Sequence, residues 1–153
     1  MQPEQSSELI FFNSLYRHGV DEKRRVQIPA KWRSSTPEVL TLILWPKGTM
    51  PEACLLVLPP NEWNVLVQKL KAMPFADPKA EALRRLLGKK SDRVTSDKAG
   101  RICLPEAMAA AAGIDKEALL VGMVDRFEIW NPKRYEGASA VDDALLSDAF
   151  KLI

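Results

Sequence analysis

A nine-residue segment that occurs twice is the strongest constraint on how this chain can fold. Residues 21–29 read DEKRRVQIP and residues 97–105 read DKAGRICLP, so each position of the first copy has its counterpart 76 residues later. Repetition at a fixed offset indicates a fold built from copies of one unit. Two copies are too few for a solenoid, but they suit a pseudo-symmetric domain in which each half completes the other.

Each copy predicts a basic turn followed by a short strand and a helix. Asp21 and Asp97 are suited to opening a turn, because a short carboxylate accepts hydrogen bonds from backbone N–H groups two residues on. Gly100 can take a positive φ, and we assign these three residues to turn structure. The next residues alternate in character as in a half-buried strand. Pro29 and Pro105 then suit the first turn of a helix.

Outside the repeats, the pattern of apolar runs and breakers predicts the other elements of both halves. Helix starts are expected at Asn61, at Asp77 with Pro78, and at Asn131, with Gly88 ending the second helix. A loop is expected over 46–51, and the first eight residues are expected to be loosely held. Further strands are expected over 14–18, 39–45, 53–58, 93–95, 118–124 and 127–130.

The expected fold class is therefore mostly β with helices, an α+β protein with a duplicated, pseudo-twofold core. We divide the chain into four parts. They are a first half (12–74), a linking helix (75–90), a second half (91–138) and a C-terminal helical tail (139–153).

Positive charge is concentrated in the repeats, although the chain carries a net charge of only +2. Residues 17–33 have a net charge of +4 and residues 89–101 a net charge of +3. Two concentrated basic turns on a nearly neutral protein favour phosphate binding. The alternative is that these are solvated turns without a ligand. The repetition of the pattern favours the binding hypothesis.

Several other classes of protein fit the sequence poorly. The apolar run over residues 40–45 is far too short to cross a bilayer, and no secretory signal is visible. Cys54 and Cys103 lack a metal-ligand spacing and are expected to be small core residues. His18 is the only histidine available to activate a nucleophile. We therefore expect a cytoplasmic protein that is not an enzyme. We expect it to bind no cofactor, no metal and no small-molecule substrate, and not to associate with a membrane.

Residues 16–33, YRHGVDEKRRVQIPAKWR, closely resemble the N-terminal signature of the MraZ family of bacterial transcriptional regulators. The family's recurring element, an Asp followed four residues later by an Arg, is present here as Asp21 with Arg25 and Asp97 with Arg101. The resemblance implies the swapped-hairpin barrel of AbrB-type regulators, assembly into a homo-oligomeric ring, and DNA binding through the basic turns. Arg24 stands where the family usually has Gly, which predicts a different backbone shape for the first turn.

These features together predict a sequence-specific, nucleoid-associated regulator that binds repeated promoter sites on double-stranded DNA. Arg25 and Arg101 could each brace their own Asp, or present their planar fork to phosphate or to guanine in the major groove, and the two roles are compatible. The alternative function is a protein-interaction scaffold or antitoxin-type partner of the AbrB kind, which would bind protein through its apolar C-terminal segment. The candidate DNA-binding residues are Arg17, His18, Lys23, Arg24, Arg25, Lys98 and Arg101.

Overall fold

The computed structural model describes residues 9–153, so the segment expected to be loosely held, residues 1–8, lies outside the described residues. The strands are β1 (Leu15–Gly19), β2 (Arg25–Gln27), β3 (Val39–Lys47), β4 (Met50–Leu58), β5 (Ser91–Thr95), β6 (Arg101–Cys103), β7 (Glu117–Gly122) and β8 (Phe127–Trp130). The helices are the 3-10 helix η1 (Ala30–Trp32), α1 (Pro60–Ala72), α2 (Pro78–Lys89), α3 (Glu106–Ala111), α4 (Pro132–Ala149) and the 3-10 helix η2 (Phe150–Leu152).

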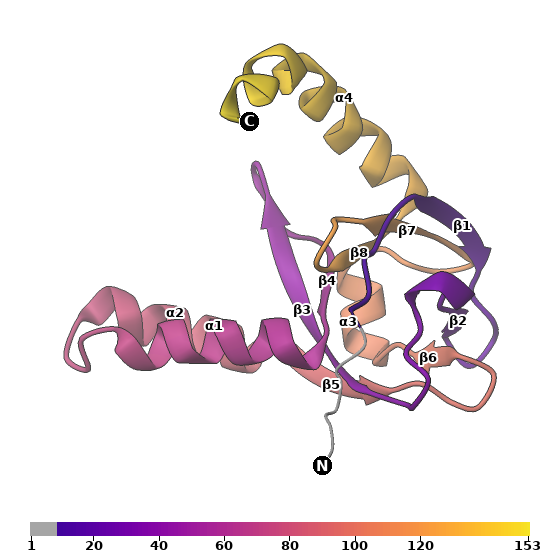
Figure 1. Ribbon diagram of the computed structural model, residues 1–153, viewed down its shortest axis with the longest axis horizontal. Coiled ribbons are helices and arrows are strands. Elements are labelled where there is room, and N and C mark those ends of the chain that lie inside the picture. The colour runs from indigo at the N-terminus through magenta and orange to yellow at the C-terminus, as the bar shows by residue number, and fades with distance from the viewer. Residues whose placement is uncertain (1–8) are drawn as a thin grey trace.

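The strands form two antiparallel sheets, which confirms the α+β class (Figure 1). One sheet has six strands in the order β1-β7-β8-β4-β3-β5, and the other is a ribbon of β2 and β6. Within residues 9–153, β1 and β5 are the edges of the larger sheet, so strand pairing there does not close the expected barrel. The ribbon instead packs against the same core as the sheet.

Strand pairing interlocks the two halves of the chain. β1 of the first half pairs with β7 of the second, and β5 of the second half pairs with β3 of the first. β2 and β6, one from each repeat, pair with each other. Each half therefore completes the other, as the duplicated segment predicts. The division of the chain into four parts stays a prediction, and α4 runs without a break across the boundary placed at residue 138.

The main core lies between the ribbon and the larger sheet. Val26 and Ile102, at the centre of the ribbon, are completely buried and belong to one cluster with the inward side chains of β3, β4, β7 and β8. Aromatic rings close one side of this cluster: Trp32 lies 4.9 Å from Phe127 and 5.7 Å from Phe12 between ring centroids. This packing fixes the ribbon on the body of the protein.

Three of the expected local features differ from the structure. The loop expected over 46–51 is wrong, because β3 and β4 leave only Gly48 and Thr49 between them. Gly48 has a φ of +58°, which a tight two-residue hairpin turn requires. Asn61 does not cap α1, which instead begins at Pro60 after Pro59 without a side-chain cap. Gly88 lies inside α2 and does not end it.

The two other helix starts are confirmed. The Asp77 side chain accepts a hydrogen bond from the backbone N–H of Lys79, 2.9 Å away. The Asn131 side chain accepts from the backbone N–H groups of Lys133 and Arg134. In both cases a short polar side chain satisfies N–H groups that have no partner inside the helix.

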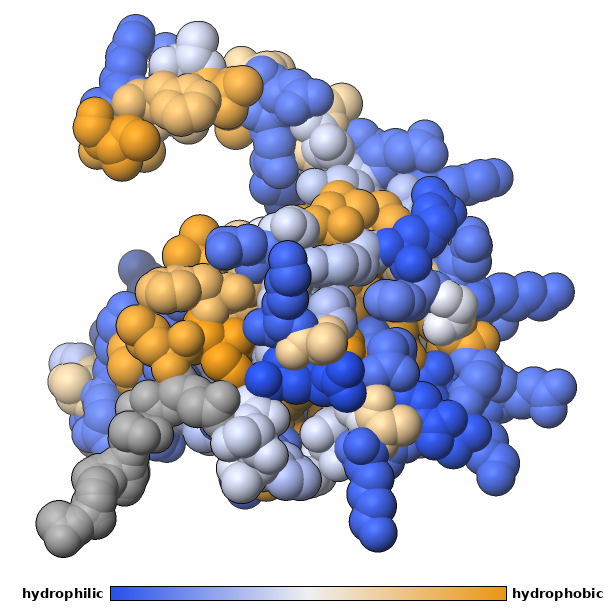
Figure 2. Space-filling model, turned by 45° about the vertical axis from the view of Figure 1, so that its right-hand side comes forward, coloured by the Kyte–Doolittle hydropathy of each residue, from blue (hydrophilic) through white to orange (hydrophobic). Residues whose placement is uncertain are grey.

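Two helical extensions project from this body. The hairpin of α1 and α2 projects from one side of the body, and α4 projects from another side (Figure 1). The free end of α4 carries exposed apolar side chains, visible at the top of Figure 2. They are Val141, Leu145, Leu146, Phe150, Leu152 and Ile153. Among the described residues, no helix is long and apolar enough to span a membrane.

Candidate nucleic-acid interface

The ribbon brings the two repeats together on one face. Its register pairs Arg25 with Cys103, Val26 with Ile102 and Gln27 with Arg101. Since side chains alternate between the faces of a strand, the buried central pair places all four flanking residues on the opposite, outward face. Arg25 and Arg101 are therefore diagonal neighbours on this face. The usual spacing of such neighbours in an antiparallel pair is about 7–8 Å between Cα atoms.

The two turns before these strands have the same hydrogen bonds. Oδ1 of Asp21 accepts from the backbone N–H groups of Lys23 and Arg25, at 3.0 and 2.8 Å. Oδ1 of Asp97 accepts from those of Ala99 and Arg101, both at 2.9 Å. The turn-structuring role predicted for the two aspartates fits this geometry.

Reciprocal bonds join each turn to the other repeat. The backbone N–H of Ile28 donates to the carbonyl of Gly100, and the N–H of Leu104 donates to the carbonyl of Arg24, both at 2.9 Å. On the outward face, the side chain of Gln27 donates to the carbonyl of Ala99 at 2.7 Å. Its counterpart Cys103 lies with Sγ 3.2 Å from the carbonyl of Lys23. The pseudo-twofold relation thus holds at the level of single hydrogen bonds.

The first turn has the same backbone shape as the second, contrary to the expectation based on Arg24. Arg24 has a φ of +60° and Gly100 a φ of +83°. Their backbone N–H groups donate to the carbonyls of Asp21 and Asp97, at 2.9 and 3.0 Å. Arg24 accepts a conformation that suits glycine better, and its Nε donates to the carbonyl of Leu104 at 3.0 Å.

Each turn aspartate also holds the arginine four residues later. Oδ2 of Asp21 lies 2.7 Å from Nε of Arg25, and Oδ2 of Asp97 lies 3.0 Å from Nε of Arg101. The backbone N–H of the partner arginine is the largest cause that lowers the pKa of each carboxyl below its usual value. About a third of each arginine side chain remains exposed. These contacts use Nε, so the terminal nitrogens of the guanidinium fork can bind a further acceptor.

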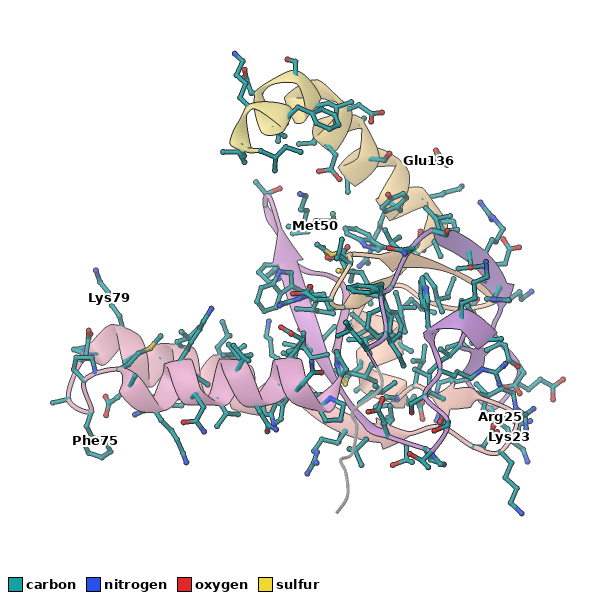
Figure 3. All side chains as sticks on the ribbon, viewed as in Figure 1. Lys23, Arg25, Met50, Phe75, Lys79 and Glu136 are labelled. Carbon is teal, nitrogen blue, oxygen red and sulfur yellow. The ribbon has the colours of Figure 1, made fainter. Side chains whose placement is uncertain are left out.

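Lysines at the turn tips add positive charge beside these arginines. Lys23 and Lys98 are both exposed, and within the described residues neither side chain forms an ion pair. Figure 3 shows Lys23 and Arg25 together at the end of the molecule away from Phe75 in the α1–α2 connection. The turns therefore present a compact cationic surface, which we call the basic face: Lys23, Arg25, Lys98 and Arg101.

Arg17 and His18 lie outside the basic face, on the edge strand β1. Arg17 forms an ion pair of 2.8 Å with Glu117 on β7. The His18 ring stacks near Tyr16, with 6.3 Å between centroids, and its Nε2 is buried without a hydrogen-bond partner in the described part of the chain. The structure does not bring these two residues together with the turn tips, and their DNA-binding role stays a prediction.

Comparison with known proteins finds one family that matches the chain twice. The model of the family described as "MraZ protein, putative antitoxin-like" matches residues 11–86 and again residues 89–150. These two matches cover nearly all of the sequence. The chain belongs to the MraZ family.

Curated relatives are similar over most of their length as well. The MraZ-family chain is 37% identical to "Transcriptional regulator MraZ" of Desulfitobacterium hafniense over 93% of this chain and 96% of the relative. It is 30% identical to the protein of the same description from Hydrogenovibrio crunogenus, over 92% and 93%. The protein of that description from Carboxydothermus hydrogenoformans is 38% identical over 78% and 80%.

Sequence reasoning missed three residues near the turns of this MraZ-family protein. Gln27 and Cys103 flank the two arginines on the outward face, and the alternation of the strands could have placed them there. Cys103 is exposed, so its expected place in the core is wrong, whereas Cys54 is buried as expected. Arg33 donates from Nη1 to the carbonyl of Ala99 at 3.1 Å. The repeat gives no signal for Arg33, because its counterpart is Ala109.

The described residues contain no group of three or more His, Cys, Asp or Glu side chains that could hold a metal ion.

Proposed function

We propose that this protein is a sequence-specific DNA-binding transcriptional regulator that engages DNA through the two basic turns of each subunit. The observation that carries the proposal is the placement of Arg25 and Arg101 on one outward face of a ribbon built from both repeats. Planar guanidinium groups recognise phosphate and the major-groove edge of guanine. The description of the relatives as transcriptional regulators supports the same function.

In this proposal, the residues of the basic face have distinct roles. Lys23 and Lys98 contact phosphates and set the position of the protein on the duplex. Arg25 and Arg101 read base edges with the terminal nitrogens that their aspartates leave available. The aspartates hold the arginine stems in place, so bracing and base reading are compatible.

One subunit offers few contacts, so we propose that affinity arises from a homo-oligomer on repeated promoter sites. Linked weak sites gain orders of magnitude in avidity when the spacing of the DNA repeats matches that of the turns. The exposed apolar side chains at the free end of α4 support contacts with other subunits, because large exposed apolar patches mark interaction surfaces. We propose a ring as the form of the assembly.

The proposed role places the protein in the cytoplasm, in association with the nucleoid. It is a regulatory role that requires neither catalysis nor a cofactor. The proposed binding partner is double-stranded DNA that contains short repeats.

A second candidate function is a protein-interaction module of the antitoxin kind. The wording of the family description and the same apolar end of α4 favour it. In that case the apolar segment would bind a partner protein, and the basic turns would be solvated.

The salt dependence of duplex binding distinguishes the two functions. Fluorescence anisotropy with a labelled duplex of repeats from the host's promoter should show affinity that falls by about 0.9 log unit per log unit of salt for each phosphate contacted. A scrambled duplex of equal length should bind more weakly. Weak binding without a salt slope would contradict the proposal and favour the protein-interaction module.

A further inference from the structure

Two hollows lie behind the two turns and are related by the same 76-residue offset as the repeats. The hollow behind the second turn has a volume of about 450 Å³ and lies between that turn and the segment after β2. The hollow behind the first turn lies between that turn and α3. Arg33 and Gly100 line the former, and their counterparts Ala109 and Arg24 line the latter.

The two hollows differ in the origin of their guanidinium group. In the hollow behind the first turn, Arg24 of the turn itself supplies the guanidinium, and its Nε donates to the carbonyl of Leu104. In the hollow behind the second turn, the guanidinium belongs to Arg33, which comes from the opposite half of the chain and covers the turn. A Cβ placed on Gly100 would lie 2.2 Å from Nη1 of Arg33. The glycine therefore makes room for a guanidinium that its own position does not provide.

Arg33 retains an unused donor in this setting. Its Nη1 donates to the carbonyl of Ala99, but its Nε is buried and has no hydrogen-bond partner among residues 9–153. Buried donors in native proteins are nearly always paired, so a small turn of the Arg33 side chain that brought Nε to the wall of the hollow would give this donor an acceptor from outside the chain. A positively charged donor favours an anionic acceptor.

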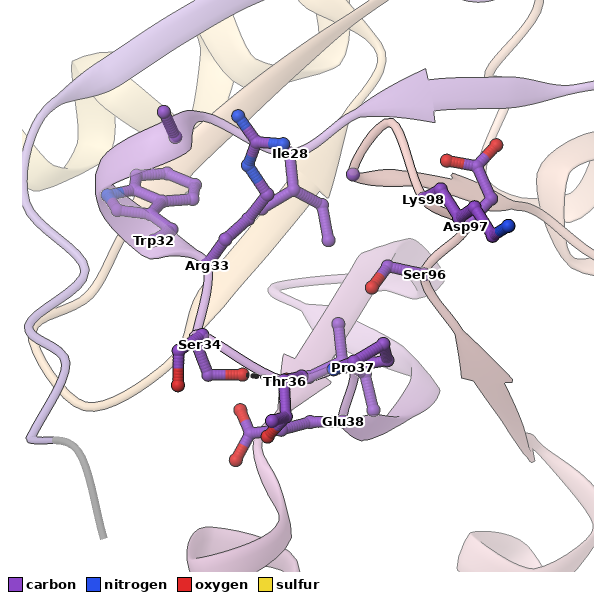
Figure 4. Close-up of a pocket in the computed structure, with 14 residues that line it drawn as sticks. Ile28, Trp32, Arg33, Ser34, Thr36, Pro37, Glu38, Ser96, Asp97 and Lys98 are labelled. Atoms are coloured by element: carbon purple, nitrogen blue, oxygen red, sulfur yellow. Dashed lines mark hydrogen bonds between the residues drawn. The ribbon is translucent and has the colours of Figure 1, made fainter.

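Hydroxyl groups line the same hollow. Figure 4 shows Ser96 on the side opposite Arg33, and Thr36 below the two, beside Pro37. Hydroxyls together with a guanidinium are suited to the several oxygens of a phosphate group. The volume falls in the range of pockets that hold small ligands.

The two acidic side chains of the hollow, Asp97 and Glu38, are directed to other places, and Asp97 is ion-paired with Arg101 outside the hollow's lining. Both oxygens of Asp97 already accept hydrogen bonds within the turn. The carboxylate of Glu38 points away from Arg33 in Figure 4. Lys98 also lines the hollow and contributes a second positive charge.

We infer that the hollow behind the second turn binds a phosphate group through Arg33, and that the bound phosphate holds this turn in its DNA-facing shape. The second clause rests on the proposed DNA-binding function. The phosphate belongs either to a small free molecule or to the backbone of the bound DNA. For a free ligand, linkage requires that phosphate and DNA strengthen each other's binding by the same factor.

The first arm of the test uses the protein without DNA. NMR spectra are recorded during titration with inorganic phosphate and, separately, with sodium chloride at matched ionic strength. Phosphate should give saturable shifts at the amides of Ser96 to Gly100 and at Nε of Arg33. Arg33→Ala should weaken phosphate binding at least tenfold. Lys31→Ala, which removes an equal charge from the exposed side of η1, should leave it unchanged.

The second arm measures duplex affinity against salt for the same variants. If free phosphate gives no saturable shift, Arg33→Ala should lower the slope by about one phosphate contact, which identifies the DNA backbone as the source. The inference is overturned if Arg33→Ala changes neither phosphate binding nor the slope, or if Lys31→Ala matches it in both.

A folding control and the case of a protein that binds no duplex complete the test. Thermal unfolding verifies that each variant folds, and if Arg33→Ala does not, Ser96→Ala is used in its place with a loss of several-fold expected in the same readouts. If the wild-type protein binds no duplex, the proposed function fails. Saturable, Arg33-dependent phosphate shifts would still support the phosphate site, and their absence would then overturn it.

Discussion

Arg24 and Gly100 occupy equivalent positions, and both have left-handed backbones, with φ values of +60° and +83°. Only one of the two residues is suited to that conformation, because a side chain at positive φ crowds the following carbonyl. The hydrogen bond from Nε of Arg24 to the carbonyl of Leu104 offsets part of this cost. The two halves thus reach the same turn by different means.

Substitutions at Arg24 should separate these two contributions. Arg24→Gly relieves the backbone and loses the hydrogen bond, so the free energy of unfolding should change by less than about 1 kcal/mol. Arg24→Ala loses the bond and keeps the strain, and should cost about 1 kcal/mol. Urea unfolding of both variants measures the difference. Equal stability of the two would show that the left-handed conformation carries no cost at this position.

Gly100 and Arg33 should be coupled in stability. Gly100→Ala introduces strain at positive φ and displaces the Arg33 side chain, which would otherwise lie 2.2 Å from the new Cβ. We expect a loss of about 2 kcal/mol. In the double variant with Arg33→Ala the displaced contact is already absent, so the combined loss should be smaller than the sum by at least about 0.5 kcal/mol. Additive losses would argue against this packing.

The pKa values of Asp21 and Asp97 make the turns sensitive to acid. Both are lowered, chiefly by hydrogen bonds from the backbone of Arg25 and Arg101. A depressed pKa stabilises the fold above the unfolded value of about 3.9, and this stabilisation is lost as the pH falls through the folded value. NMR titration should show the amide of Arg25 shifting below pH 4 together with the Asp21 carboxyl. Asp21→Asn should abolish this shift, and a midpoint at or above pH 4 would contradict the prediction.

The Glu128 carboxyl should have the opposite effect on how stability depends on pH. Burial raises the pKa of this carboxyl, even though the indole N–H of Trp130 donates to it at 2.7 Å. A raised pKa favours the protonated form, so the contribution of Glu128 to stability is full below the unfolded value of about 4.3 and is lost as the pH rises through the folded value. Glu128→Gln should therefore raise Tm at pH 7 and have little effect at pH 4.

The matched control for this change is Glu136→Gln, at an exposed position of α4. It should leave Tm unchanged at both values of pH. A Tm for Glu128→Gln below that of the wild type at pH 7 would show that the charged carboxylate, held by Trp130, stabilises the fold.

The sequence was sufficient to predict the features that depend on local pattern. The repeat offset and the alternation in Arg25–Gln27 and Arg101–Cys103 predict the turns, the strands and a pseudo-symmetric core. Asp77 and Asn131 are recognisable as caps because their short polar side chains precede proline. These signals lie within a few residues of the structure that they produce.

Contacts between the halves could not be predicted in the same way. Arg33 covers Gly100 only because strand pairing brings the two segments together, and nothing near Arg33 in the sequence indicates this. The shape of the first turn was also mispredicted, since the preference of Arg24 for negative φ is overridden by hydrogen bonds that converge on Asp21. Tertiary context decides both cases.

Substitutions on the basic face should change the affinity of the protein for DNA and its preference for the promoter sequence. Arg25→Ala should reduce affinity for a promoter-repeat duplex by about 1–3 kcal/mol per engaged turn and relax the preference over a scrambled duplex, because the guanidinium reads a base. Lys23→Ala should weaken binding to both duplexes alike and lower the salt slope by about one. Anisotropy titrations at several salt concentrations measure both quantities.

Arg25→Lys serves as the matched control, because it keeps the charge and loses the planar fork. If Arg25 reads a base, the lysine variant should discriminate between the duplexes as poorly as the alanine variant while it retains most of the salt slope. If Arg25 contacts only phosphate, Arg25→Lys should resemble the wild type in both measurements, and base reading would then have to come from another residue of the outward face, for which Gln27 is the nearest candidate.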